Sequence, residues 1–178
     1  TQEIFVSMFE EDNVEFFIEL NDERLFNGKL TAGADNFSNV QFLLYNESNN
    51  QWLSAVTDNF GNFSEYIPSG DWLIIVSPQE IENTTYTLRH PITIDDDLSV
   101  RTDISLALFE AVNVNMTLVE SMTDNFVDNA RVIAVSNDGY GNITLGASNL
   151  SGYVSDTIMP GSWTLTLTKE TSDKKWTI

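Results

Sequence analysis

The feature that most constrains this chain is an internal repeat with a spacing of 91 residues, the separation of Gly61 and Gly152. A short polar residue precedes each glycine by three positions: Asp58 precedes Gly61, and Asn149 precedes Gly152. Short polar residues and glycine at this spacing are typical of tight turns. A repeat of this length indicates that the chain folds as consecutive copies of one small unit.

The repeat extends in both directions from these turns. Upstream, Asp35–Phe37 matches Asp124–Phe126, and an apolar-alternating strand at Val14 matches another at Val112 with a spacing of 98. The larger spacing predicts a longer loop in the first copy, between Leu20 and Asp35. An Asn-Gly pair within that stretch also favours a loop.

Strands are predicted throughout, because apolar and polar residues alternate in short runs. Asn115, for example, separates Val114 from Met116, and the run that starts at Trp163 alternates with threonines. No apolar period of 3.6 residues extends beyond about two helical turns. We therefore expect an all-β chain that forms tandem Greek-key β-sandwiches.

The repeat also predicts where each copy begins and ends. Residues 1–10 match the strand at Ile104–Glu110 with a spacing of 100, so they are expected to be the last strand of a preceding repeat. Residues 11–108 form a complete copy, and residues 109–178 form a second copy that lacks its last strand. Either a longer parent chain supplies that strand, which is the alternative we favour, or residues 1–10 of this sequence fill its place, which requires a long reach or a neighbouring molecule. Self-association through the open strand edge is therefore expected.

At these residues the sequence resembles the carboxypeptidase regulatory-like and collagen-binding B-type modules, which are small sandwiches of the transthyretin type with an Ig-like layout. The resemblance rests on a polar-glycine hairpin followed by a proline-glycine turn into a tryptophan strand. Its residues are Asp58, Gly61, Phe63, Pro68, Gly70 and Trp72, and then Asn149, Gly152, Val154, Pro160, Gly161 and Trp163. It implies a fold rather than an activity, because such modules serve as spacers, adhesin stalks and enzyme appendages.

Charge and composition narrow the class of partner. The formal net charge is -19, which disfavours nucleic acid and anionic membrane surfaces, and no apolar run is long enough to span a membrane. Cysteine is absent, which excludes disulfides and thiolate metal sites. Calcium is the cofactor that acidic turns could bind, with the runs Asp95-Asp96-Asp97 and Glu10-Glu11-Asp12 as candidate ligands. Otherwise no cofactor is expected.

Glycosylation is predicted from an excess of Asn-x-Ser/Thr sequons. The seven sequons exceed the roughly three that the Asn, Ser and Thr content gives by chance. Their acceptors are Asn36, Asn46, Asn62, Asn83, Asn115, Asn142 and Asn149. Such density favours an extracellular or cell-surface location, and an acidic, lysine-poor chain favours an archaeal or bacterial source.

No constellation of catalytic residues is evident. His90 is the single histidine and precedes Pro91, and no nucleophile-elbow motif occurs. We therefore expect a non-enzymatic structural repeat: a stalk, spacer or surface-layer element that contacts neighbouring repeats of its own chain. The alternatives are an adhesin-type glycan- or protein-binding module, for which Tyr45, Trp52 and Phe60 are candidate exposed aromatics, and a non-catalytic accessory domain of a secreted hydrolase.

Overall fold

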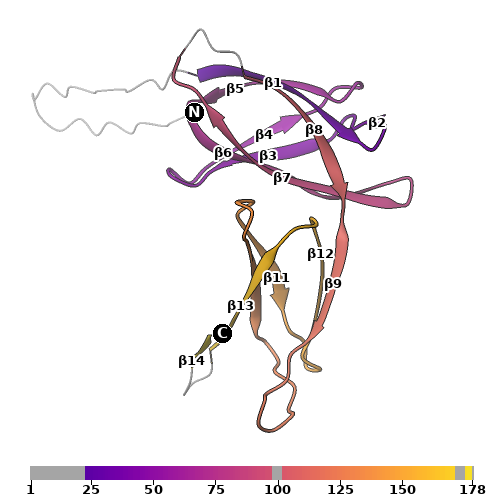
Figure 1. Ribbon diagram of the computed structural model, residues 1–178, viewed down its shortest axis with the longest axis vertical. Coiled ribbons are helices and arrows are strands. Elements are labelled where there is room, and N and C mark those ends of the chain that lie inside the picture. Colours follow the sequence, from indigo (N-terminus) through magenta and orange to yellow (C-terminus); the bar gives the residue numbers. More distant parts are fainter. Residues whose placement is uncertain (1–22, 98–101, 171–174, 178) are drawn as a thin grey trace, which may run out of the picture.

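The computed structural model describes residues 23–97, 102–170 and 175–177, which form two successive β-sandwiches (Figure 1). None of these residues lies in an α-helix, and so none belongs to a helix that could cross a membrane. The all-β prediction is therefore confirmed. The strands are β1 (Glu23–Ala32), β2 (Asp35–Asn36), β3 (Gln41–Asn46), β4 (Gln51–Val56), β5 (Asn62–Pro68), β6 (Gly70–Ile81), β7 (Thr84–Ile94), β8 (Thr102–Glu110), β9 (Val112–Thr117), β10 (Arg131–Ser136), β11 (Asn142–Ala147), β12 (Tyr153–Ile158), β13 (Trp163–Glu170) and β14 (Lys175–Thr177).

The first module, β1 to β8, has two layers. One is the antiparallel sheet β4-β3-β6-β7, and the other is formed by β5, β1 and β8. β8 runs parallel to β1, with Phe26 opposite Thr102 at the start of the pairing. Its last residues pair with β7 instead, where Thr87 lies opposite Phe109. β8 therefore joins the two layers at one edge of the sandwich.

The second module repeats this order without a counterpart of β8. Its sheets are β11-β10-β13-β14 and β12-β9, which correspond in order to β4-β3-β6-β7 and β5-β1. Among the described residues, no strand follows β14 or pairs with the outer edge of β9. Consecutive β-sandwiches are therefore confirmed, and the described part of the second one has no strand equivalent to β8.

Equivalent hydrogen bonds recur in the two copies. The amide of Leu30 donates to the carbonyl of Gly61, and that of Leu118 donates to the carbonyl of Gly152, both over 2.8 Å. A buried hydroxyl also recurs: the Oγ1 of Thr57 donates to the Phe37 carbonyl over 2.6 Å. In the second copy the Oγ of Ser148 donates to the Val127 carbonyl over the same distance. The repeat is therefore a repeat of backbone geometry as well as of sequence.

These bonds correct the alignment of the first strand. Leu30 matches Leu118, so the partner of β9 is β1 and the spacing is 88, whereas the expected partner was the strand at Val14. The residues from Val14 to Leu20 lie outside the described part of the chain. The expected long loop up to Asp35 is also wrong, because Glu23–Ala32 is a strand.

A smaller correction follows the first strand. Phe37 matches Val127 rather than Phe126, since each accepts the buried hydroxyl and each amide donates to the equivalent leucine carbonyl. Phe37 is fully buried, whereas Phe126 is 58% exposed. The second copy therefore has two more residues in this hairpin, which the Asp-Asn-Phe match concealed.

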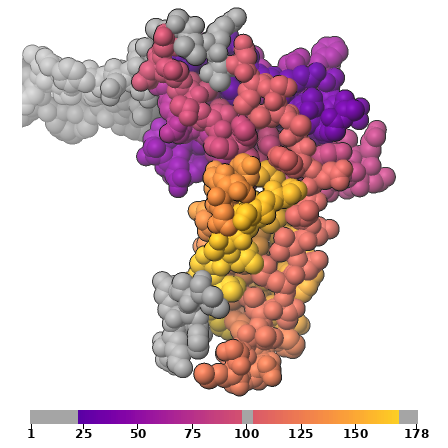
Figure 2. Space-filling view, in the orientation of Figure 1, coloured from indigo at the N-terminus to yellow at the C-terminus, as the bar shows by residue number. Residues whose placement is uncertain are grey.

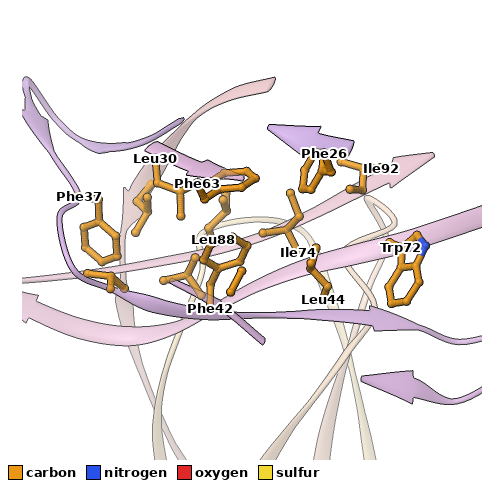
Figure 3. Close-up of a cluster of buried hydrophobic side chains, with 14 of the residues drawn as sticks. Phe26, Leu30, Phe37, Phe42, Leu44, Phe63, Trp72, Ile74, Leu88 and Ile92 are labelled. Carbon is orange, nitrogen blue, oxygen red and sulfur yellow. The ribbon is translucent and has the colours of Figure 1, made fainter. Parts of the chain in front are cut away.

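Each module has its own hydrophobic core. In the first, aromatic rings from both layers interlock: Phe63 lies 5.0 Å from Phe26 and 4.8 Å from Phe42 between ring centroids (Figure 3). The buried members of the second core are smaller and fewer: Val132, Ala134, Leu145, Val154 and Ile158. Burial of these side chains supplies the main driving force for folding.

Candidate functional site at the junction of the two modules

The two modules meet without a linker. β8 ends at Glu110 and β9 begins at Val112, and between them the amide of Ala111 donates to the Thr85 carbonyl over 2.7 Å. Figure 1 shows that the second module stands on the outer face of the sheet that contains β3, β6 and β7. In Figure 2 the orange and yellow atoms of the second module abut those of the first. A one-residue connection of this kind restricts the relative motion of the two sandwiches.

Arg89 fastens the junction. From β7 its Nε donates to the carbonyl of Tyr140 over 2.7 Å, and its Nη2 donates to the carbonyl of Asn142 over 3.1 Å. Both carbonyls belong to the hairpin between β10 and β11. Burial lowers the pKa of the Arg89 guanidinium, which nevertheless stays protonated. A partly buried cation thus donates to two backbone acceptors of the neighbouring module.

Apolar groups seal the same contact. Ile75 and Met159 are 8% and 1% exposed, although they belong to neither core. The Met159 sulfur accepts a hydrogen bond from the Arg89 amide over 3.4 Å. A Cβ added to Gly141 would lie 3.0 Å from a methyl group of Leu73, so the hairpin turn packs directly on the sheet. The junction therefore combines contacts between apolar side chains with hydrogen bonds donated by the charged guanidinium of Arg89.

A groove of about 830 Å³ opens beside this contact, within the size range of small-ligand sites. The β3–β4 hairpin, strands β6 and β7, and the β10–β11 turn of the second module form its walls. Its lining includes Tyr45, Glu47, Trp52, Asp71, Thr93 and Gly139. Residues of both modules therefore line the groove.

A stacked aromatic pair forms one wall of the groove. Tyr45 and Trp52 are cross-strand neighbours, with ring centroids 4.2 Å apart and planes inclined by 25°. Trp52 is 52% exposed. Phe60, the third aromatic candidate, is 66% exposed but lies in the β4–β5 turn outside the groove. The structure therefore brings two of the three candidate aromatics together.

A second hollow lies on the first module, but its polar side chains bond to one another. Asn27 donates to Asp103 over 3.2 Å and accepts from Ser64 over 2.7 Å. Asp58 accepts from the amides of Asn62 and Phe60, each over 2.8 Å. Those hydrogen bonds, the strongest from Asn62, hold the pKa of Asp58 below its usual range. The arrangement shapes a turn and leaves few free groups for a ligand.

The residues of the repeat signature occupy turns and core positions. Asn149 caps its turn as Asp58 does, and accepts from the amides of Ser151 and Tyr153. Gly61 and Gly152 have φ angles of 78° and 69°. The side chains of Phe63, Val154 and Trp72 are buried, whereas Trp163 is half-buried. Pro68 is the last residue of β5 and Gly70 the first of β6, whereas Pro160 and Gly161 lie in the turn between β12 and β13. The indole N–H of Trp72 donates to the Pro68 carbonyl, and that of Trp163 donates to the Met159 carbonyl.

Six of the seven sequon asparagines are exposed: Asn36, Asn62, Asn83, Asn115, Asn142 and Asn149. Asn46 is the exception, at 5% exposure. Its Oδ1 accepts from the amides of Ser48 and Asn49, and its Nδ2 lies near Gly70. Asn46 therefore differs from the other six in that its amide is buried in the folded chain, and its glycosylation stays a prediction.

The acidic candidates do not converge. Within the described residues, no group of three or more His, Asp or Glu side chains is placed to hold a metal ion. The amide of Asp97 donates to the Asp95 side chain over 2.9 Å, while the carbonyl of Asp96 accepts from Arg24 over 2.6 Å. The first bond closes a local turn, and the second ties that turn to Arg24 on β1. The other run, Glu10-Glu11-Asp12, lies outside the described part of the chain.

Sequence reasoning identified the aromatic pair but missed the residues that build the junction. Arg89 contacts a hairpin about fifty positions away in the chain, and Met159 lies still further along. Neither belongs to a motif. Arg89 sits between Leu88 and His90, where period-two alternation gives it an outward position but no partner. The connection from β10 to β11 that Arg89 contacts is the hairpin turn after Ser136.

Comparisons with known proteins find only remote structural likeness. No family model and no curated protein sequence matches the chain. Among solved structures, a DUF3823 family protein from Parabacteroides merdae has 12% identity and a TM-score of 0.39, over 83% of this chain and 90% of that one. A streptococcal ancillary pilin has 11% identity and a TM-score of 0.38, over 88% and 58%. The shaft pilin SpaA from Lactobacillus rhamnosus GG has 10% identity and a TM-score of 0.36, over 87% and 92%. Such remote likeness assigns no activity or ligand.

Proposed function

We propose that the chain is a non-enzymatic structural segment of a secreted or cell-surface protein, in which two sandwiches are fixed at a set angle. The observation that carries this proposal is the clamp of Arg89 on the β10–β11 hairpin, next to a connection of one residue. A flexible tether would have a polar linker and an unburied interface. A spacer that positions its neighbours has the features seen here.

Surface chemistry supports an exterior location. The net charge of -19 keeps a long array soluble and self-repelling. Six exposed sequons would carry glycans without disturbing either core. The family assignment to carboxypeptidase regulatory-like modules is part of the same proposal and rests on the repeat signature. A role beside a secreted hydrolase is a further alternative, which a catalytic domain elsewhere in a parent chain would favour.

The rigidity of the junction can be measured directly, because a chain without cysteine accepts spin labels at chosen positions. Ser54→Cys on β4 and Ser151→Cys at the far turn of the second module place one exposed label on each sandwich. Double electron–electron resonance should give one narrow distance distribution. Arg89→Ala should broaden it, whereas Arg131→Ala, which removes an exposed arginine from β10, should leave it narrow. A broad distribution in the parent chain would contradict the proposal.

A second candidate function is the binding of a glycan by the groove, which the Tyr45–Trp52 stack favours. Aromatic faces pack against sugar rings, and Asp71 and Glu47 offer acceptors for hydroxyl groups beside them. Glycan-array binding that is lost in Trp52→Ala and kept in Phe60→Ala would support it. Equal binding by the two variants, or none by the parent chain, would leave the spacer as the whole function.

A further inference from the structure

The two modules differ at one strand position. In the first module β1 lies between β5 and β8, and each of its edges is paired. Its counterpart β9 pairs with β12 along one edge only, and no strand in the described part of the chain covers the other. The peptide groups along that free edge have unused hydrogen-bonding capacity, which invites pairing with an extended segment.

The free edge borders an open core. Leu165 is 39% exposed, whereas the equivalent Ile74 in the first module is fully buried. Leu118 is half-buried, whereas the equivalent Leu30 is fully buried. Val112, at the start of β9, is 43% exposed. In the first module, β8 and the later part of β7 cover this side of the core. In the second module the same side therefore presents apolar surface.

In the first module, strand β8 covers the corresponding side of the core. β8 adds Ile104, Leu106 and Leu108 to the core, and Leu108 is only 6% exposed. The residues between them, Ser105 and Ala107, are exposed. The strand thus combines main-chain pairing to β1 with apolar side chains at alternate positions.

The same pattern occurs once more in the sequence, at its beginning. Ile4, Val6 and Met8 take the places of the three inward β8 residues, and the pattern continues into Phe9-Glu10, which is identical to Phe109-Glu110. The structure does not describe residues 1–10. Their sequence is the one in this chain that matches the vacant position.

We propose that the free edge of β9 binds the segment from Gln2 to Met8 of a second copy of this chain as a parallel strand. The register follows from the repeat. Gly28 lies opposite Ile104 in the first module. Their counterparts are Met116 and Ile4, so Ile4 of the second copy lies opposite Met116. Thr117 then lies opposite Phe5. Since every copy carries one donor strand and one acceptor edge, the contact is heterologous and joins copies head to tail.

Charge predicts how this association responds to salt. Each copy carries a net charge of -19, so two copies repel each other at long range. Added salt screens this repulsion, and at 0.1 M the charges that lie more than about 10 Å apart are largely screened from each other. Association through β9 therefore strengthens as sodium chloride rises, opposite to a contact built from ion pairs.

Cross-linking in the full chain tests the partner and its register. Neighbouring strands lie about 4.8 Å apart, within reach of a disulfide. The double variant Phe5→Cys/Thr117→Cys should form a ladder of covalent oligomers on non-reducing gels. Phe5→Cys/Asn115→Cys, which is displaced by two residues on the same face, should form far less. The proposal is overturned if neither variant forms a ladder, if both form it equally, or if the bond forms within one chain.

Light scattering without cross-links gives an independent test. The average mass of the parent chain should rise with concentration, more steeply in high salt. Val6→Asp puts a charge on the inward face of the donor strand and should shift this rise to at least about tenfold higher concentration, the equivalent of about 1.4 kcal/mol. Ser7→Asp, on the outward face, should behave like the parent apart from its added charge. A parent that stays monomeric, or two variants that shift equally, would refute the proposal.

Discussion

Gly28 on β1 and Phe63 on β5 lie opposite each other, and the Phe63 ring occupies the space where a side chain at position 28 would be. A Cβ added to Gly28 would lie 2.3 Å from the tip of that ring. The ring cannot retreat easily, because Phe26 and Phe42 flank it. In the second copy the equivalent pair is Met116 and Val154, so a large and a small residue have exchanged sides.

This exchange predicts the outcome of a double-mutant cycle. Gly28→Met should destabilise the first module by about 3 kcal/mol or more through overpacking. Phe63→Val should cost about 2–4 kcal/mol through the cavity it leaves. The double variant should cost at least about 1 kcal/mol less than the sum, because methionine refills the cavity. Urea unfolding measures all three values, and strict additivity would show that the two positions do not share one space.

Thr57 is predicted to tolerate serine but not alanine. Its buried hydroxyl donates to the Phe37 carbonyl and accepts from the Val40 amide over 3.0 Å. Thr57→Ala leaves both backbone groups without a partner, at about 1–3 kcal/mol each. Thr57→Ser should cost less than about 1 kcal/mol, since Ser148 makes the same bonds in the second copy. Thermal melts of the two variants should therefore separate clearly, and similar melts would assign the effect to the methyl group.

Replacing Gly61 with alanine should destabilise the fold more than the same change at Gly139, which has a similar φ angle. Gly61 and Gly139 have φ angles of 78° and 82°, but only Gly61 is crowded. A Cβ there would lie 2.4 Å from the Leu30 carbonyl oxygen, whereas one on Gly139 meets nothing within 4 Å. Gly139→Ala should cost about 1–2 kcal/mol for the backbone angle alone. Gly61→Ala should cost clearly more in denaturant unfolding, and equal costs would show that the close approach is relieved freely.

Asp58 gives a pH dependence with a definite sign. Because its pKa is lowered in the folded state, its carboxylate stabilises the fold above the unfolded value of about 3.9. That contribution fades as the pH falls from there through the folded pKa. Asp58→Asn should keep the turn, as Asn149 does, and should flatten the fall in melting temperature below about pH 4. An unchanged acid profile would assign the acid sensitivity to other carboxylates, such as Asp128, which is paired with Lys169.

The repeating unit could be predicted from the amino-acid sequence, because tight turns require particular residue types at single positions. A capping Asp58 or Asn149 and a glycine at positive φ are local requirements, and they recur at one spacing. Alternation revealed most strands for the same reason. It failed at β1, where Gly28 occupies an inward position and interrupts the apolar pattern. The glycine is required by Phe63, which is distant in the chain, so no local reading could explain it.

The contact between the modules and the unpaired edge of β9 could not be predicted from the sequence and became visible only in the folded chain. The contacts of Arg89, Ile75 and Met159 join elements far apart in sequence, and each residue alone is compatible with an exposed or a buried position. That docking also brings the β10–β11 turn to the groove lined by Tyr45 and Trp52. Local propensity is encoded residue by residue, whereas an interface is a property of two surfaces that become neighbours only after each sandwich has folded.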